Sequence, residues 1–233
     1  IPLGLQFSVL AIGIIVMQSV IVQFDTLGGE MVSNAAQNGF GAANKLNNLL
    51  MTPLNGLGAA MTSFTAQNLG AGDHARIKKG TVQALIIVWT MCLISIAAGL
   101  LLSRGGGYLY IFLSPDKVTA ETMRYGNTYL YVDLSLYLFL GFIFVVRNCV
   151  QGIGKPQFVL GAGAAELAAR VSVCLLLPPL IAGGPVNSDA PRAAVYALCF
   201  ADPFAWMAAD AVLLVPFLRN IMKMDYRYLK GTM

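Results

Sequence analysis

Two oppositely charged side chains in an apolar stretch are the first residues of this sequence that could do chemistry. Glu166 and Arg170 are four residues apart, with the acid on the N-terminal side. On a helix this spacing places both side chains on one face, within reach of a salt bridge. Counted from Pro156 at about 1.5 Å per residue, they lie roughly 15 and 21 Å along the helix, near the middle of a bilayer. Such a pair can lock helices together, relay a proton or cation, or contact a substrate.

A second group of acids follows in the last apolar stretch. Asp202, Trp206 and Asp210 recur at intervals of four residues, so they share roughly one helix face. We hypothesise that Asp202 pairs with Arg170, which would give a Glu–Arg–Asp cluster between two helices. Trp206 fits either helix packing or the wall of a cation site, because aromatic faces attract cations. Asp210 and Asp133 fall nearer the expected helix ends, where we expect interfacial water to reach them.

An amide-rich stripe runs along a predicted helix over residues 39–69. On a wheel of about 100° per residue, its polar side chains fall within roughly 40° of one another, and apolar residues cover the other side. The stripe consists of Asn44, Asn48, Asn55 and Thr62, with Asn47 beside it. Lipid cannot satisfy these amides, so they face a neighbouring helix or a hydrated cavity, and their number favours the cavity. Pro53 removes one backbone hydrogen bond, so we expect a bend there.

The whole chain has the composition of a membrane protein. Of its 233 residues 57% are hydrophobic and 11% are charged, and the mean hydropathy is +0.69, whereas soluble domains carry about 25% charged residues. A membrane helix needs about 20 mostly apolar residues. We therefore predict an all-α integral membrane protein, a six-transmembrane-helix bundle that forms a single membrane domain over residues 1–233. The predicted spans are residues 3–24, 39–69, 81–103, 125–146, 156–182 and 193–218.

Lysine and arginine are unevenly divided between the two ends of these spans, and the richer side is expected to be cytoplasmic. Both chain ends fall on the richer side, so we place both termini of the segment in the cytoplasm and the protein in the plasma (inner) membrane. The net charge of +4 reflects this bias and does not indicate a nucleic-acid partner. Nine basic residues lie on the richer side, namely Arg76, Lys78, Lys79, Arg147, Lys155, Arg219, Lys223, Arg227 and Lys230, against Arg104, Lys117, Arg124 and Arg192 on the other.

The sequence carries no recognisable catalytic, metal-binding or nucleotide motif. Its four cysteines all fall in predicted spans without a CxxC pair and are typical of small buried apolar residues. The single histidine, His74, lies in a loop, and the run Gly105–Gly107 lacks the strand and the Lys-Ser/Thr of a phosphate loop. We therefore predict no enzyme activity, no metal site and no cofactor.

Short motifs at two turns carry a family resemblance. The run from Met51 to Gly80 reads MTPLNGLGAAMTSFTAQNLGAGDHARIKKG, and a later turn reads Gln151-Gly152-x-Gly154-Lys155-Pro156. The chain itself opens on Pro2-x-Gly4-Leu5-Gln6. These motifs, ordered and correctly spaced across six predicted spans, resemble those of the MATE family, the multidrug and toxic-compound extrusion transporters, over the whole chain.

The resemblance implies that the chain is the C-terminal lobe of a twelve-helix transporter, with an N-terminal six-helix lobe as its partner in the lipid bilayer. The start at Ile1, without an initiator methionine, agrees with a piece of a longer protein. Two such lobes, related by an axis along the membrane normal, would rock around a central cavity. The resemblance thus implies a secondary active antiporter that exports organic, cationic compounds in exchange for H⁺ or Na⁺, with the amide stripe and Trp206 lining the substrate cavity.

The coupling residue does not follow from the resemblance. Some branches of the family place one acid in the first helix of this lobe and another deep in the fourth. Here residues 1–24 hold no acid, and Asp133 falls near the outer end of the predicted fourth helix. Glu166, Arg170 and Asp202 are therefore candidates for cation coupling, or for a charge network, from local physics alone.

Two alternatives to the exporter stay open. A flippase for lipid-linked sugars would need a cationic cavity to meet diphosphates, whereas the predicted spans hold four acids against two bases. A membrane scaffold without transport activity would tolerate apolar residues at Asn48, Asn55 and Glu166. A transporter with the same changes would insert normally but stop moving its substrate.

Overall fold

The computed structural model describes residues 2–223, with side chains from residue 11 onward. This part of the chain is almost entirely helical, with a two-residue antiparallel hairpin in its first loop. In that hairpin β1 (Thr26–Leu27) pairs with β2 (Glu30–Met31). The side chains of the opening Pro2-x-Gly4-Leu5-Gln6 motif lie outside the described residues, as do the predicted cytoplasmic residues Arg227 and Lys230.

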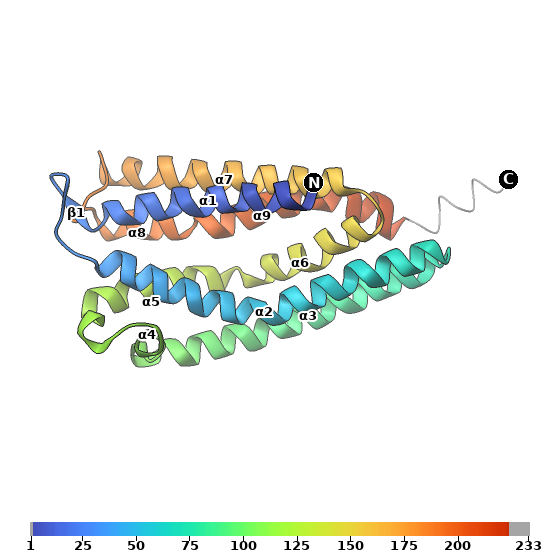
Figure 1. The fold of residues 1–233 in the computed structure, drawn as a ribbon, viewed down its shortest axis with the longest axis horizontal. Coiled ribbons are helices and arrows are strands. Elements are labelled where there is room, and N and C mark those ends of the chain that lie inside the picture. Colours follow the sequence, from blue (N-terminus) through green and yellow to red (C-terminus); the bar gives the residue numbers. More distant parts are fainter. Residues whose placement is uncertain (1, 224–233) are drawn as a thin grey trace.

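Long helices follow the apolar stretches predicted from the sequence (Figure 1). The fifth predicted span coincides with its helix, and the second and third helices begin earlier than predicted, at Ala35 and His74. The long helices are α1 (Pro2–Gln23), α2 (Ala35–Gly70), α3 (His74–Ser103), α5 (Ala120–Ser135), α6 (Tyr137–Gly152), α7 (Pro156–Ala182), α8 (Arg192–Cys199) and α9 (Ala201–Pro216). The short ones are η1 (Arg104–Gly106), α4 (Leu109–Phe112), η2 (Pro115–Lys117) and η3 (Phe217–Met222).

Several of these segments have the length and composition of membrane spans. Within residues 2–223 three qualify alone, namely His74–Gly106, Pro156–Ala182 and Arg192–Met222, and the pair of α5 and α6 qualifies when it is counted as one. Helix α2 is not among them despite its 36 residues, because its amides lower its hydropathy. These lengths agree with an all-α membrane fold, and the side that faces the cytoplasm stays a prediction.

The helices form two layers (Figure 1). In one layer α7 packs against α1, α8 and α9, and in the other α2 packs against α3, α5 and α6. The layers meet mainly where α6 contacts α9 and where α5 contacts α8. Helices α1 and α2 touch one another much less, so a space between the layers can remain unfilled.

One buried acid ties the end of α1 to the start of α2. Asp25 is completely buried, and its two carboxylate oxygens accept hydrogen bonds from the backbone N–H groups of Ala36 and Gln37 at 3.0 and 2.9 Å. The first N–H groups of a helix have no partner within it, and a negative charge is favourable there. Asn34, at the N-cap position itself, makes no side-chain capping bond, so the first N–H groups of α2 are capped by Asp25, in the turn after α1, and by Ser33 Oγ, which accepts from Ala35 N–H at 3.0 Å.

Two glycines let α2 and α6 approach closely. A Cβ added at Gly58 would lie 2.6 Å from Nδ2 of Asn148 and 3.1 Å from the backbone oxygen of Phe144. One added at Gly152 would lie 2.7 Å from the backbone oxygen of Thr62. Any larger residue would therefore force the helices apart. Both glycines belong to the motif runs in the sequence, so part of those motifs has a packing reason.

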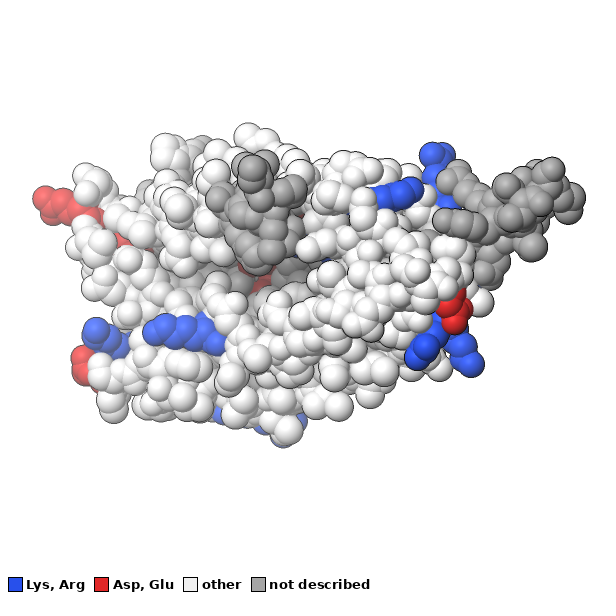
Figure 2. Space-filling view, turned by 45° about the vertical axis from the view of Figure 1, so that its right-hand side comes forward, with Lys and Arg blue, Asp and Glu red and all other residues white. Residues whose placement is uncertain are grey.

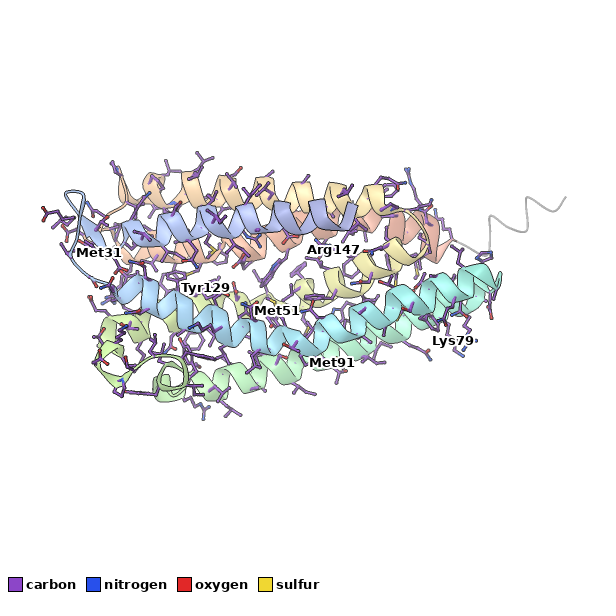
Figure 3. All side chains as sticks on the ribbon, viewed as in Figure 1. Met31, Met51, Lys79, Met91, Tyr129 and Arg147 are labelled. Atoms are coloured by element: carbon purple, nitrogen blue, oxygen red, sulfur yellow. The ribbon has the colours of Figure 1, made fainter. Side chains whose placement is uncertain are left out.

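The predicted fourth span is broken in two. The axes of α5 and α6 differ by 57°, and between them Leu136 has φ −115° and ψ 17°. Neither proline nor glycine stands at this break, so no local pattern in the sequence predicts it. Pro53, in contrast, predicts a bend in α2, and Figure 1 shows α2 changing direction near its middle, where Figure 3 labels Met51.

Candidate functional site

A cavity of about 640 Å³ lies between the two layers, within the size range of small-molecule binding sites. Its walls come from α1, α2, α6, α7 and α9, with Tyr129 of α5. Figure 2 shows a hollow on one face of the molecule with acidic atoms inside it. Tyr129 and Arg147 both line the cavity, and Figure 3 labels them between the two layers.

The amide stripe of α2 forms one wall of this cavity. Asn44, Asn48, Asn55 and Thr62 all line it, where the sequence analysis places them, although their contact with a substrate stays a prediction. Asn48 donates from Nδ2 to Oδ1 of Asn44 at 2.6 Å, and Asn55 donates from Nδ2 to the backbone oxygen of Met51 at 3.3 Å. Among the described residues, no protein donor reaches Oδ1 of Asn48 or of Asn55, so both oxygens are open to a ligand.

Further amides on α6 and α1 extend the polar surface, and the sequence analysis missed them. Asn148, Gln151 and Gln18 line the cavity as well. The hydroxyl of Thr62 donates to Oδ1 of Asn148 at 2.8 Å, which joins α2 to α6 across the wall. The absence of any helix breaker before Gly152 is the signal that could have placed Asn148 and Gln151 inside the helix.

An apolar wall faces the amides. Ile14, Met17 and Ile21 of α1 line the cavity opposite the stripe. Trp206 lines it too, but only 3% of its surface is exposed, and its ring packs edge-on against Tyr137 with the centroids 6.3 Å apart. Trp206 is therefore mainly a packing residue that contributes a small edge to the cavity.

Four charged side chains of the cavity wall form one continuous chain of ion pairs. Arg147 lies 2.7 Å from Oε2 of Glu166, and Arg170 lies 3.4 Å from Oε1 of the same carboxylate. Arg170 also lies 2.8 Å from Oδ1 of Asp202, and the hydroxyl of Tyr129 donates to Oδ2 of Asp202 at 2.8 Å. The pairing of Arg170 with Glu166 and Asp202, a hypothesis from the sequence, is present, while a role in coupling stays a prediction.

Arg147 corrects the sequence analysis, which assigns it to the cytoplasmic side because the hydrophobic run ends at Val146. In the structure α6 continues to Gly152 and turns Arg147 toward Glu166. The count of four embedded acids against two bases is therefore wrong, because a third base lies inside. The four charges that line the cavity, two arginines and two carboxylates, sum to zero.

Asp133 is a second correction. Its place near a predicted helix end predicts contact with interfacial water, but the side chain is completely buried, because α5 packs between α2 and α8. Its Oδ2 accepts a hydrogen bond from Nδ2 of Asn47 at 2.8 Å, while its Oδ1 and the Oδ1 of Asn47 are buried without a partner. Within the described residues no salt bridge joins Asp133 to a base. It is thus a buried acid without a counter-ion, one turn before the break at Leu136.

Asp210 lies on α9 beyond Asp202 and is likewise less exposed than the sequence suggests. Helix α9 continues to Pro216, so Asp210 is not at a helix end, and its Oδ1 is buried without a hydrogen-bond partner. It does not line the cavity. In the described part of the chain no group of three or more His, Cys, Asp or Glu side chains is arranged to hold a metal, and all four cysteines are buried and free.

Comparison with known proteins identifies the class to which this fold and cavity belong. The MatE family model matches residues 10–176, and the chain belongs to the MatE family. Over 173 residues it is 30% identical to the "Probable multidrug resistance protein YpnP" of Bacillus subtilis (strain 168), an alignment that covers 69% of this chain and 33% of that protein.

The fold is also similar to a solved structure. A MOP superfamily transporter from Pyrococcus furiosus Vc1 (DSM3638), described as having a binding pocket of reversed polarity, matches with a TM-score of 0.72 at 14% identity. The match covers 94% of this chain and 43% of that one, so the chain spans less than half the length of either relative. The predicted family and all-α membrane fold are confirmed, and this is a multi-pass membrane protein of a transporter family.

Proposed function

We propose that this chain is one lobe of a secondary active antiporter that exports organic compounds in exchange for H⁺ or Na⁺ by alternating access. The family, the multidrug-resistance name of the Bacillus relative and a cavity of drug size between two helix layers support this function. A second six-helix lobe would rock against this one. The distribution of lysine and arginine supports cytoplasmic ends, and a plasma-membrane location is part of the proposal.

The observation that carries the coupling step is the environment of Asp133. A buried carboxylate without a counter-ion is costly, and a bound proton or sodium ion would remove that cost. Glu166 and Asp202, the candidates from the sequence, already have both of their carboxylate oxygens bonded to protein donors. In this proposal Asp133 takes the coupling ion, and the ion-pair chain of Arg147, Glu166, Arg170 and Asp202 holds the helices around it.

Asn47 gives Asp133 a link to the cavity. Its side chain lines the cavity and also donates to Oδ2 of Asp133. A proton or sodium ion on Asp133 would compete with the amide N–H of Asn47 for Oδ2 and so change what Asn47 offers to a cargo molecule. The coupling site and the cargo site would then communicate through one side chain. The flippase alternative gains no support here, because a cavity lining with no net charge offers little to a diphosphate.

The test uses proteoliposomes that contain the protein encoded by the full reading frame. Vesicles receive a pH gradient or a sodium gradient, and the movement of ethidium, a cation, and of methylumbelliferyl glucoside, an uncharged compound, is followed by fluorescence. We expect at least one probe to move against its own gradient. Asp133→Asn should reduce that movement by about tenfold or more, equivalent to about 1.4 kcal/mol, while Asp133→Glu retains it.

Two results would contradict the proposal. One is that neither probe moves in response to either gradient. The other is that Asp133→Asn transports like the parent protein. Because asparagine has nearly the same shape as aspartate, the variant should elute from a sizing column as the parent does, and this confirms that a loss is not caused by misfolding.

A further inference from the structure

The carboxylates of the cavity wall are fully engaged by the protein itself. Glu166 receives Arg147 on one oxygen and Arg170 on the other, and Asp202 receives Arg170 on one oxygen and Tyr129 on the other. Among the described residues, no other acid lines the cavity. A permanent cation entering it would therefore have to break an existing ion pair to meet a negative charge.

The amides have the opposite character, because several of their donors and acceptors have no protein partner. Oδ1 of Asn48 and Oδ1 of Asn55 accept from no described side chain, and the side-chain amide of Gln151 makes no hydrogen bond with one. Amides offer both donors and acceptors without a net charge. They suit hydroxyl, carbonyl and amide groups better than they suit a quaternary ammonium or phosphonium group.

The remaining wall determines the overall shape of the cargo. Ile14, Met17 and Ile21 lie on α1, facing the amides of α2. A molecule that fits between these walls has an apolar side and a hydrogen-bonding side. Methionine adapts its shape to different ligands, which agrees with a range of related compounds rather than with a single one.

From these walls we infer that the cavity takes uncharged, amphipathic organic compounds that carry hydrogen-bonding groups, rather than organic cations. This inference rests on the proposed transport function and replaces the expectation of cationic cargo. That expectation came from the family resemblance, and the charge count that agreed with it lacked Arg147. With Arg147 included, the charges of the lining sum to zero. The amides are then the groups that bind the cargo.

The test compares two probes of one skeleton. Triphenylphosphine oxide is neutral and carries a strong hydrogen-bond acceptor, whereas methyltriphenylphosphonium has nearly the same shape and a permanent positive charge. Equilibrium binding of both radiolabelled probes is measured on the purified protein of the full reading frame, without any gradient. We expect the neutral probe to bind more tightly by about tenfold, the ratio produced by 1.4 kcal/mol.

Two variants assign this preference to the described cavity. The double variant Asn48→Leu, Asn55→Leu removes the open acceptors and should weaken binding of the neutral probe more than binding of the cation. Gln83→Leu is the matched control, because Gln83 is an exposed amide on α3 outside the cavity lining. Arg147→Gln frees Oε2 of Glu166 and gives the lining one net negative charge. It should therefore shift the ratio of the two affinities toward the cation by about tenfold.

Tighter binding of the phosphonium by the parent protein, or no binding of the oxide, would overturn the inference. So would an unchanged ratio in Arg147→Gln together with full binding of the oxide by the double asparagine variant. These failures differ from a failure of the transport function. Gradient-driven export of ethidium alone would sustain the antiporter and refute the neutral cargo. Selective binding of the oxide without gradient-driven movement of any probe would support the neutral cargo and refute the antiporter.

Discussion

The two polar walls of the cavity differ in how completely their hydrogen bonds are made. On the side of α6, α7 and α9, the four carboxylate oxygens of Glu166 and Asp202 all have donors, and the charges alternate and cancel. On the side of α2, the amides bond partly to one another and partly to the backbone, and some of their oxygens stay open. A wall whose polar groups all have protein partners stabilises the helix packing, whereas a wall with open acceptors can form hydrogen bonds with a ligand. Mutations in the two walls should therefore change the free energy of unfolding of the protein by very different amounts.

The largest effect is expected from Arg170→Met. This change leaves Asp202 without its base and Glu166 with one of two, and breaking a buried pair in this way costs about 3–5 kcal/mol. The midpoint of thermal unfolding in detergent should fall steeply. Adding Asp202→Asn should recover part of the loss, since it removes the charge that was left unpaired. A single variant as stable as the parent, or a double variant no better than the single one, would show that the ion-pair chain does not hold these helices.

Tyr129→Phe should have an intermediate effect. It removes one hydrogen bond to a charged carboxylate, a loss of about 1.5–3 kcal/mol, but leaves every ion pair in place. The measurement is again thermal unfolding, with Tyr131→Phe as the control, because Tyr131 lies on the same helix and is 44% exposed. Equal effects of the two changes would mean that the hydroxyl of Tyr129 does not secure Asp202.

The smallest effect is expected from Asn48→Ala, which should change the free energy of unfolding by less than about 0.5 kcal/mol. Asn48 is exposed to the cavity and bonds only to Asn44 and through its own backbone. Asn47→Ala is the direct comparison one residue away, since it removes the 2.8 Å amide hydrogen bond to the buried Oδ2 of Asp133 and should cost about 1–3 kcal/mol. If Asn48→Ala destabilises the protein as much as Asn47→Ala does, the stripe is part of the framework and the contrast between the walls fails.

Much of the helical framework could be predicted from the sequence because lipid imposes a simple rule. Long charge-poor stretches become helices, and amides within them must turn away from lipid. The first part of the rule holds for α7, whose bounds match the prediction. The second part holds for the amide stripe of α2, which lines a cavity. The spacing of Glu166 and Arg170 was also informative, because neighbours four apart on a helix must share a face.

The parts that could not be predicted depend on tertiary contacts. The break at Leu136 has no proline or glycine to announce it. The burial of Asp133 follows from packing between α2 and α8, and a single-helix pattern contains no information on such packing. Arg147 was misplaced because hydropathy detects where apolar residues end, whereas α6 continues past that point to Gly152. Arg147 stands just beyond an apolar run, so hydropathy assigns it to a loop. Only its ion pair with Glu166 places it inside the protein.

The cap that Asp25 provides also governs how the cavity walls can move. Its two short bonds to Ala36 and Gln37 hold the turn after α1 against the start of α2, and a slip of one residue, about 1.5 Å along the axis of α2, would break both of them. Rotation about that point leaves them intact. The two helices can therefore pivot about Asp25 but cannot slide past one another there. Helix α1 carries the apolar wall and α2 carries the amides. A pivot at Asp25 would therefore widen the gap between these walls most at the end farthest from Asp25.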